Sequence, residues 1–387
     1  MLGTRVTGIA YPLLVLDLTQ SPAKAGLVGF AQSLPFMLFY LPAGALVDRW
    51  NRKRVMLVTE AGRAVALGSI AVTLALGSTP FAQIVVVAFV EGSLFVFFRL
   101  SESSALPHVV AREQLPAAIA QNQAREQGAD LAGQPLGGVL FAVGRAVPFL
   151  FDAVSYAVSF VSLLFIRRSF QEEREPRSTR LLAEIKEGVS WLWNQTFLRV
   201  TVLLVTVTNF VWSAVYLALI VRAQDLGASP GVIGLMLAFG GVGALLGSLV
   251  APWLQRRIHP KVVVIASLWM WAITAPVLAL VPNVFAIGVV WAVTTIAGPV
   301  FNVCVASYRY ALVEDRLLAR VQSAALVVAW GAIPLGQLTA GVLLESSGAV
   351  ATIFALAGLN LVAALLATLA RSIRNAPDVK ELLATNA

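Results

Sequence analysis

Two stretches of this 387-residue sequence repeat one another: Gly44-Ala-Leu-Val-Asp-Arg-Trp-Asn-Arg-Lys-Arg54 and Gly247-Ser-Leu-Val-Ala-Pro-Trp-Leu-Gln-Arg-Arg257. They share a glycine, a leucine, a valine and a tryptophan at matching positions, and both end in basic residues. Pro135-Leu-Gly137 recurs as Pro334-Leu-Gly336 at nearly the same offset. Two matches at one offset predict that the chain consists of two related halves.

The composition is far more apolar than that of a soluble domain. Hydrophobic residues make up 58% of the chain and charged residues 12%, whereas soluble proteins carry about 25% charged residues. The apolar residues form blocks of about 20, which is the length of a helix that crosses a bilayer. We predict twelve such spans, near residues 1–18, 23–46, 55–76, 81–103, 119–143, 147–166, 196–222, 230–252, 262–281, 284–306, 322–344 and 349–370.

The basic residues between the spans predict an orientation. Cytoplasmic connections of membrane proteins carry an excess of lysine and arginine. With the N-terminus inside, the outer connections hold only Lys24, Arg145 and Arg222. The inner connections hold Arg49, Arg52, Lys53, Arg54, Arg167, Arg168, Arg174, Arg177, Arg180, Lys186, Arg256, Arg257, Lys261, Arg309, Arg316 and Arg320. We therefore expect a protein of the inner membrane with both termini on the cytoplasmic side.

The longest polar stretch divides the predicted halves. We expect an N-terminal six-helix bundle over 1–168, a cytoplasmic linker over 169–195, a C-terminal bundle over 196–372 and a tail over 373–387. Within the linker, Leu182 to Trp193 has the pattern of an amphipathic helix at the membrane interface, and a plain tether is the alternative. The first apolar block has no charged leader or cleavage site, so it is not a signal peptide. Because it is barely long enough to span, we expect that the first helix has lost part of its start.

Several classes of function are disfavoured by what the sequence contains. The net charge of +8 would suit nucleic acid, but the basic residues lie between spans, where topology explains them. The single cysteine, Cys304, makes no disulfide or zinc cluster within the chain. His108 and His259 lie far apart, so we expect no metal site and no histidine-based enzyme. The absence of a phosphate-binding loop predicts that no nucleotide or other cofactor is used.

The loop Gly44-x-x-x-Asp48-Arg49-x-x-Arg52-Lys53 resembles the signature loop between helices 2 and 3 of the major facilitator superfamily. The resemblance implies an all-α membrane protein with the major facilitator fold, two six-helix bundles related by a pseudo-twofold axis. It also implies that this loop acts as a latch between two states, with its basic residues paired to a carboxylate at the inner end of helix 4. Glu102 is the candidate for that carboxylate. Asn51 replaces a glycine of the motif, Ala251 replaces the aspartate in the second copy, and a simple positive-inside loop is the alternative.

Further segments resemble the drug–proton antiporter branch that contains macrolide-efflux proteins and the enterobactin exporter. They are Leu106-Pro-His-Val-Val-Ala-Arg-Glu-Gln-Leu115, Ala120-Gln-Asn-Gln123, Asp152-Ala-Val-Ser-Tyr156 and Glu187-Gly-x-x-Trp-Leu192. The resemblance covers nearly the whole chain. It is specific for the family but says little about which substrate is transported. It implies a monomeric, proton-driven exporter of drugs, siderophores or other bulky small molecules.

The fifth span contains Gly133-Gln-Pro135-Leu-Gly137-Gly138, which resembles the glycine–proline motif of antiporters in this superfamily. Gln134 separates the glycine from the proline here, unlike in the usual motif. A membrane proline bends a helix, and glycines allow close helix contact. A kink that favours exchange and ordinary small-residue contact between helices are both open interpretations.

Two acidic residues lie deep in predicted spans, Glu91 in the fourth and Asp130 in the fifth. An acid at such depth costs roughly 2.5–3.5 kcal/mol to insert and usually faces a cavity with a partner. Desolvation favours the protonated acid and a nearby guanidinium favours the ionised one. We therefore expect proton coupling at Glu91 or Asp130 with Arg5 as the partner, a static ion pair being the alternative.

The other charged residues in the spans are expected to be structural. Glu60 and Arg63 are three residues apart near the inner end of the third span, which suits a local helix pair. Asp17, Asp152 and Glu345 lie at or near span ends, where we expect water within reach.

The second half carries no deep acid, but it offers aromatic and hydrogen-bonding side chains on the helices that line the cavity in this fold. Such groups suit a bulky, partly apolar solute, and helix contact is the alternative for each. The candidates are Asn209, Trp212, Tyr216, Trp291, Thr294 and Asn302.

The sequence thus predicts a secondary transporter that works by alternating access. Uptake of a nutrient, and a non-transporting sensor of the same fold, remain alternatives because fold alone does not set function.

Overall fold

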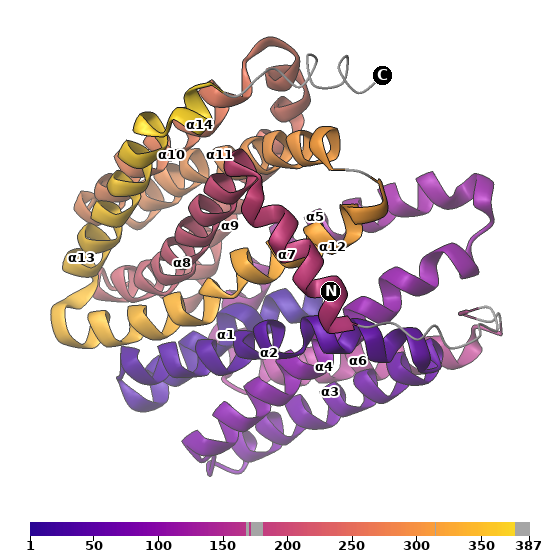
Figure 1. Ribbon diagram of the computed structural model, residues 1–387. Helices are drawn as coiled ribbons and strands as arrows, with labels where there is room; N and C mark the ends of the chain where they lie inside the picture. The colour runs from indigo at the N-terminus through magenta and orange to yellow at the C-terminus, as the bar shows by residue number, and fades with distance from the viewer. Residues whose placement is uncertain (168–169, 172–180, 314, 376–387) are drawn as a thin grey trace. The chain divides into compact units, whose positions relative to one another are not determined.

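The computed structural model describes residues 1–167, 170–171, 181–313 and 315–375. Every regular element in these ranges is a helix, and the chain is shown in Figure 1. The all-α prediction is confirmed.

The first predicted half contains six long helices and one short 3₁₀ turn. Each predicted span has its own helix, and most ends agree within a few residues. The helices are α1 (Leu2–Thr19), α2 (Pro22–Arg49), α3 (Arg52–Ala75), α4 (Phe81–Val109), η1 (Arg112–Gln114), α5 (Leu115–Val143) and α6 (Val147–Phe165).

The second half is less regular. One predicted span, 322–344, is interrupted between Trp330 and Ala332, and Gly348 with φ 74° separates the last two spans inside one assigned helix. A positive φ suits glycine because it lacks a Cβ atom. The helices are α7 (Leu181–Asn194), α8 (Thr196–Asp225), α9 (Pro230–Arg257), α10 (Pro260–Leu280), α11 (Val284–Leu312), α12 (Asp315–Trp330), α13 (Ala332–Leu369) and α14 (Arg371–Arg374).

Local signals explain where several helices begin. Ser21 caps α2 by accepting a hydrogen bond from the backbone N–H of Lys24, and Pro22 follows at the first helical position. Asn51 caps α3 and Asn283 caps α11 in the same way. A side-chain oxygen at this position satisfies a backbone N–H that the helix leaves unpaired.

Nine helical segments of the described ranges are long and apolar enough to cross a membrane. One of them, Arg320–Leu369, covers the last two predicted spans. Together with α1 and α5, these segments account for the twelve predicted spans.

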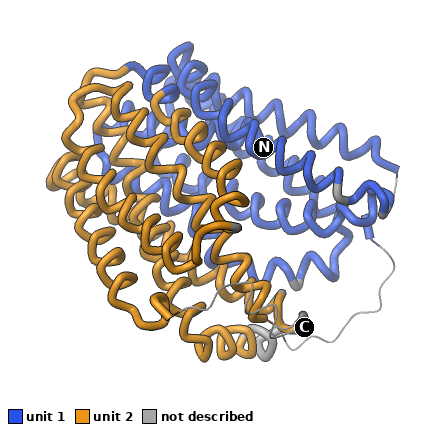
Figure 2. Tube along the Cα trace, turned by 90° about the horizontal axis from the view of Figure 1, so that it is seen from above, with its two compact units in different colours: residues 1–179, 229–235 blue, residues 180–228, 236–387 orange. Residues whose placement is uncertain are grey.

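The chain forms two compact units, coloured separately in Figure 2. The first comprises residues 1–179 and 229–235, and the second residues 180–228 and 236–387. Within the first unit α2 packs on α4, α3 on α4 and α6, and α1 on α5. Within the second, α13 packs on α8 and α10, and α10 on α11.

The repeated Pro-Leu-Gly sequence makes equivalent contacts in the two units. Gly137 of α5 lies against Val6 and Ile9 of α1, while Gly336 of α13 lies against Phe210 and Ser213 of α8. A Cβ atom at either glycine would collide with the neighbouring helix. The repeat therefore preserves close contact between the fifth and first long helices of each half.

Helix α7 belongs to the second unit. It packs on α12, and Leu192 is buried in a cluster with Leu198, Val321 and Tyr308. Gly188 faces the backbone of Arg320, whose guanidinium pairs with Glu187. These contacts make α7 part of a folded unit.

Candidate functional site

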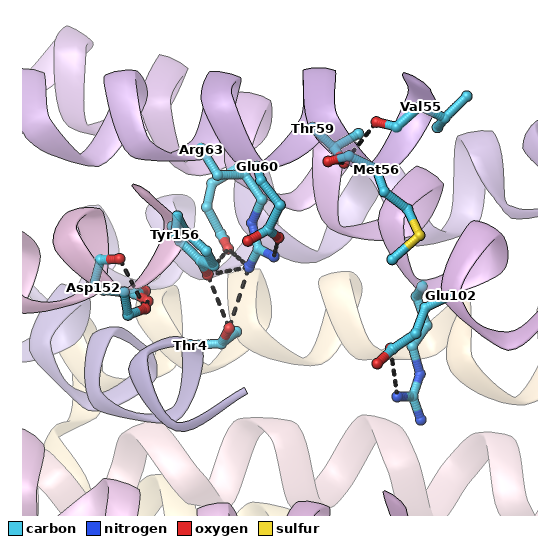
Figure 3. A network of polar contacts seen from close by, with 12 residues as sticks. Thr4, Val55, Met56, Thr59, Glu60, Arg63, Glu102, Asp152 and Tyr156 are labelled. Carbon is cyan, nitrogen blue, oxygen red and sulfur yellow. Dashed lines mark hydrogen bonds and ion pairs between the residues drawn. The ribbon is translucent and has the colours of Figure 1, made fainter. Parts of the chain in front are cut away.

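Arg63 lies at the centre of a buried polar cluster in the first unit. It is near the middle of α3, and its side chain is 2% exposed. Its guanidinium donates to Glu91 Oε1 at 2.6 Å and to Thr4 Oγ1 at 3.2 Å, and it also donates to the hydroxyl of Tyr156. Glu60 Oε1 is 3.9 Å away. Figure 3 shows Arg63, Glu60, Tyr156 and Thr4 converging from three helices.

The buried acids around Arg63 have their own hydrogen-bond donors. Gln32 of α2 donates to the second oxygen of Glu91 at 3.1 Å. Asp152 of α6 accepts from Thr7 at 3.0 Å and from Ser155 at 3.0 Å. We call the set the Arg63 network; it consists of Thr4, Thr7, Gln32, Glu60, Arg63, Glu91, Asp152, Ser155 and Tyr156.

The structure extends one expectation about this region and overturns another. Glu60 and Arg63 form the expected local pair, but the closer carboxylate to Arg63 is Glu91 of the next helix. Asp152 was expected to be within reach of water, but it is fully buried because α1 and α3 pack against α6. Three carboxyl groups thus share one arginine in a region that excludes solvent.

A second charged site lies between α1 and α5. Arg5 forms an ion pair with Asp130, and the two side chains are 54% and 36% exposed. Gly133, one turn after Asp130, lies directly against Arg5, so that a Cβ atom there would collide with it. The glycine therefore lets α5 approach α1 closely enough for the pair to form.

The structure separates the three residues predicted for proton coupling into two sites. Arg5 was considered as the partner of either acid, and it pairs with Asp130. Glu91 pairs instead with Arg63, which lies on α3, the helix against which α4 packs.

Arg52 and Lys53 of the signature loop have partners other than Glu102, so the expected pair with Glu102 is not formed among the described residues in this structure. Arg52 is buried and donates to the carbonyl oxygens of Ser104, at 2.8 Å, and Phe170. Lys53 donates to the carbonyl of Ile166 at 2.6 Å. These side chains satisfy backbone groups at the ends of α4 and α6.

The remaining loop residues are placed as follows. Asp48 is 68% exposed and lies 3.6 Å from Arg52, one turn away. Glu102 accepts from Arg125 of α5 at 2.7 Å and lies near Arg99, since the start of α5 is closer to it than the loop. Arg49 is exposed, and a Cβ atom at Gly44 would meet nothing within 4 Å.

The glycine–proline motif of α5 lies in one uninterrupted helix that contains Pro135. Gly133 and Gly137 face α1, and Gly138 faces Pro230 and Gly234. These contacts fit the small-residue interpretation, and the exchange role of the motif stays a prediction.

Three tryptophans meet in the second unit. The ring centroid of Trp212 lies 6.0 Å from that of Trp271 and 5.6 Å from that of Trp291. Trp271 donates its indole N–H to the carbonyl of Thr294 at 3.0 Å. The indole nitrogen of Trp212 is buried and has no hydrogen-bond partner among the described residues.

The other cavity candidates are placed as follows. Asn209 donates to the carbonyl of Ala329 at 2.8 Å, and the Thr294 hydroxyl bonds back to Val290. Asn302 is exposed. Tyr216 lies on α8, four residues after Trp212.

Sequence reasoning missed Arg63, Tyr156, Thr4 and Gln32 as members of a site. One signal was available: Arg63 lies well inside an apolar span, and ionisable residues there face the interior of the bundle. Tyr156 was singled out only as part of the segment Asp152–Tyr156 that resembles the antiporter branch, and that segment did not indicate a contact with Arg63.

The family model described as transmembrane secretion effector matches residues 1–385. The multidrug efflux pump Tap of Mycolicibacterium fortuitum is 25% identical over 92% of this chain and 88% of its own length. Tap of Mycobacterium tuberculosis is 26% identical over 92% and 87%. The structure of a bacterial homologue of the human lysosomal transporter Spinster superposes with a TM-score of 0.76 at 14% identity, covering 96% of this chain and 94% of that one. The chain therefore has the major facilitator fold and belongs to the transmembrane secretion effector family of the major facilitator superfamily.

Proposed function

We propose that this multi-pass membrane transporter exports bulky, partly apolar small molecules in exchange for protons. The observation that carries the proposal is the Arg5–Asp130 pair. It is an ion pair inside the first unit, and both side chains remain partly exposed. Such a carboxylate exchanges protons with water when its cavity opens. When the carboxylate has lost its proton, the guanidinium pairs with its negative charge. The efflux function of the Tap relatives supports the outward direction.

Asp130 is the coupling acid in this proposal, and Glu91 is not. Both oxygens of Glu91 are engaged, and its side chain is 2% exposed. A proton would have to cross packed side chains to reach Glu91, whereas it reaches Asp130 directly. Arg5 is the switchable partner.

The solute is an aromatic or otherwise apolar molecule with few hydrogen-bonding groups. The rings of Trp212, Trp271 and Trp291 support this, as does the unpaired indole N–H of Trp212. Aromatic walls with a few polar groups are typical of sites for such ligands. We place the protein in the inner membrane with both termini in the cytoplasm, as a monomer that needs no nucleotide or other cofactor.

The exposed carboxylate of Asp48 serves as the latch of the signature loop. Asp48→Ala is expected to shift the inward–outward population, measured as the accessibility of single cysteines to a membrane-impermeant thiol reagent. An unchanged accessibility pattern would refute the latch.

Transport by the full chain in proteoliposomes tests the proposed function. The probes are ethidium, a macrolide antibiotic and a catecholate siderophore, with the membrane potential clamped and a pH gradient imposed. An antiporter accumulates its solute in the acidic compartment, and a protonophore abolishes the accumulation. Accumulation in the alkaline compartment would indicate symport and thus uptake. Failure of every probe to respond to the gradient would contradict the proposal and favour a sensor.

A further inference from the structure

A pocket of about 640 Å³ opens beside the turn between α2 and α3, in the first unit. Arg49, the last residue of α2, and Arg54, in the first turn of α3, lie at one end of it. Val58, Leu94 and Phe97, further along α3 and α4, line the rest. The pocket is therefore polar at the helix ends and apolar toward the helix middles.

Among the described residues, no ion pair neutralises the positive charge at this end of the pocket. Arg49 and Arg54 are exposed, and neither makes an ion pair with any side chain of the described residues. The nearby carboxylate of Asp48 pairs with Arg52. Arg52 itself is turned inward, toward the carbonyls of Ser104 and Phe170. Two guanidinium groups without an ion-pair partner in the described part of the chain thus flank the opening, and an anion there can bind both.

The apolar part of the pocket is open to the side of the helices. Val58 is 67% exposed and Trp50 is 47% exposed. Trp50 stacks on Phe97 with a ring separation of 6.1 Å, which forms a flat wall. Arg54 and Val58 are one helical turn apart, about 6 Å along the axis. A ligand that fits must therefore be anionic at one end and hydrocarbon a few ångströms away.

We propose that this pocket binds a membrane phospholipid with an anionic headgroup. The phosphate pairs with Arg49 and Arg54, and the first carbons of an acyl chain lie on Val58, Leu94 and Phe97. Arginine suits phosphate because its planar donors bind two oxygens at once, and tryptophan favours the headgroup level of a bilayer. The proposal concerns a binding site outside the solute pathway, and it stands or falls independently of proton coupling.

The second copy of the signature loop provides a matched control. Arg257 occupies the position equivalent to Arg54, but its guanidinium lies over the ring of Trp253 at 5.2 Å. Lys261 follows in the first turn of α10. Changing Arg257 and Lys261 to glutamine removes the same amount of charge from the equivalent region and leaves the pocket intact.

Native mass spectrometry of the full-length protein with added phosphatidylglycerol or phosphatidylcholine tests the proposal. The wild type is expected to prefer phosphatidylglycerol by about thirtyfold, since each of two basic residues attracts anionic lipid by roughly 1 kcal/mol and about 1.4 kcal/mol is a factor of ten. R49Q/R54Q is expected to lose the preference, and R257Q/K261Q to keep it. V58W, which fills the apolar wall and leaves both arginines, is expected to weaken phosphatidylglycerol binding in a protein whose melting temperature is unchanged.

Three results would overturn the proposal. One is equal binding of the two lipids by the wild type. Another is a preference that persists in R49Q/R54Q or disappears equally in R257Q/K261Q. The third is displacement of phosphatidylglycerol by millimolar inorganic phosphate, because the acyl contacts would then contribute nothing.

Discussion

The Arg63 network and the Arg5–Asp130 pair use the same chemical groups in opposite surroundings. Arg63 and Glu91 are each 2% exposed, and hydrogen bonds from three helices surround them. Arg5 and Asp130 are 54% and 36% exposed and form an ion pair with one another. The first arrangement joins side chains of α1, α2, α3, α4 and α6, whereas the second joins only α1 and α5.

The difference teaches that a charge inside a membrane bundle does not by itself identify a coupling site. A buried charge must be paired, because leaving it alone in a region of low dielectric constant is very unfavourable. A coupling acid must lose its partner during the cycle, so it needs access to water. The two sites both pair an arginine with a carboxylate, and they differ in how exposed these side chains are.

The largest effect is expected from Arg63→Gln. The change removes the guanidinium shared by the buried Glu60, Glu91 and Asp152, and breaking a buried ion pair in this way costs about 3–5 kcal/mol. Arg5→Gln is the matched change at the exposed pair and is expected to cost less than about 1 kcal/mol. Thermal unfolding in detergent measures both, and similar losses in the two variants would erase the proposed distinction.

A smaller effect is expected from Gly133→Ala. The added methyl group would collide with Arg5 and push α5 from α1, which typically costs about 1–3 kcal/mol. Gly128→Ala on the same helix is the control, because nothing lies within 4 Å of a Cβ atom there; it is expected to be neutral or stabilising by up to about 1 kcal/mol. Equal stability of the two variants would show that the close approach of α5 to α1 does not contribute to the stability of the folded protein.

An effect similar to that of Gly133→Ala is expected from Tyr156→Phe. It removes the hydroxyl that joins Arg63 to Thr4 and keeps the ring, on which the guanidinium lies at 4.0 Å. The loss of hydrogen bonding is expected to lower the unfolding free energy by about 1–3 kcal/mol, below the loss for Arg63→Gln. Transport at saturating solute should not change. A transport defect in a stably folded Tyr156→Phe protein would place the network in the solute or proton pathway.

Much of the fold could be predicted from the sequence because apolar blocks report span length directly. The block 147–166 became Val147–Phe165, and 23–46 became Pro22–Arg49. The break between Trp330 and Ala332 was not predicted, because the span was assigned from hydropathy, which continues across Gly331. Gly331 followed by Pro334 is a pattern typical of a helix end.

The pairing of side chains across helices was harder to predict. Hydropathy identifies a span and says little about which face meets which neighbour. Arg63 was therefore assigned to Glu60, three residues away, and Glu102 to the loop, although the shortest ion pair of each runs to another helix. Asp130 was expected to have a charged partner, because its depth in the span made an unpaired charge implausible.

The central claim is that Asp130 carries the proton and Glu91 does not. The most direct measurement compares Asp130→Asn with Glu91→Gln in proteoliposomes, with a solute that the wild type accumulates against its gradient. The account predicts that Asp130→Asn loses pH-driven accumulation by tenfold or more, while it retains exchange of labelled for unlabelled solute without a gradient; Glu91→Gln, once folded, keeps both. Accumulation on the acidic side by Asp130→Asn, or its selective loss in Glu91→Gln, would contradict the account.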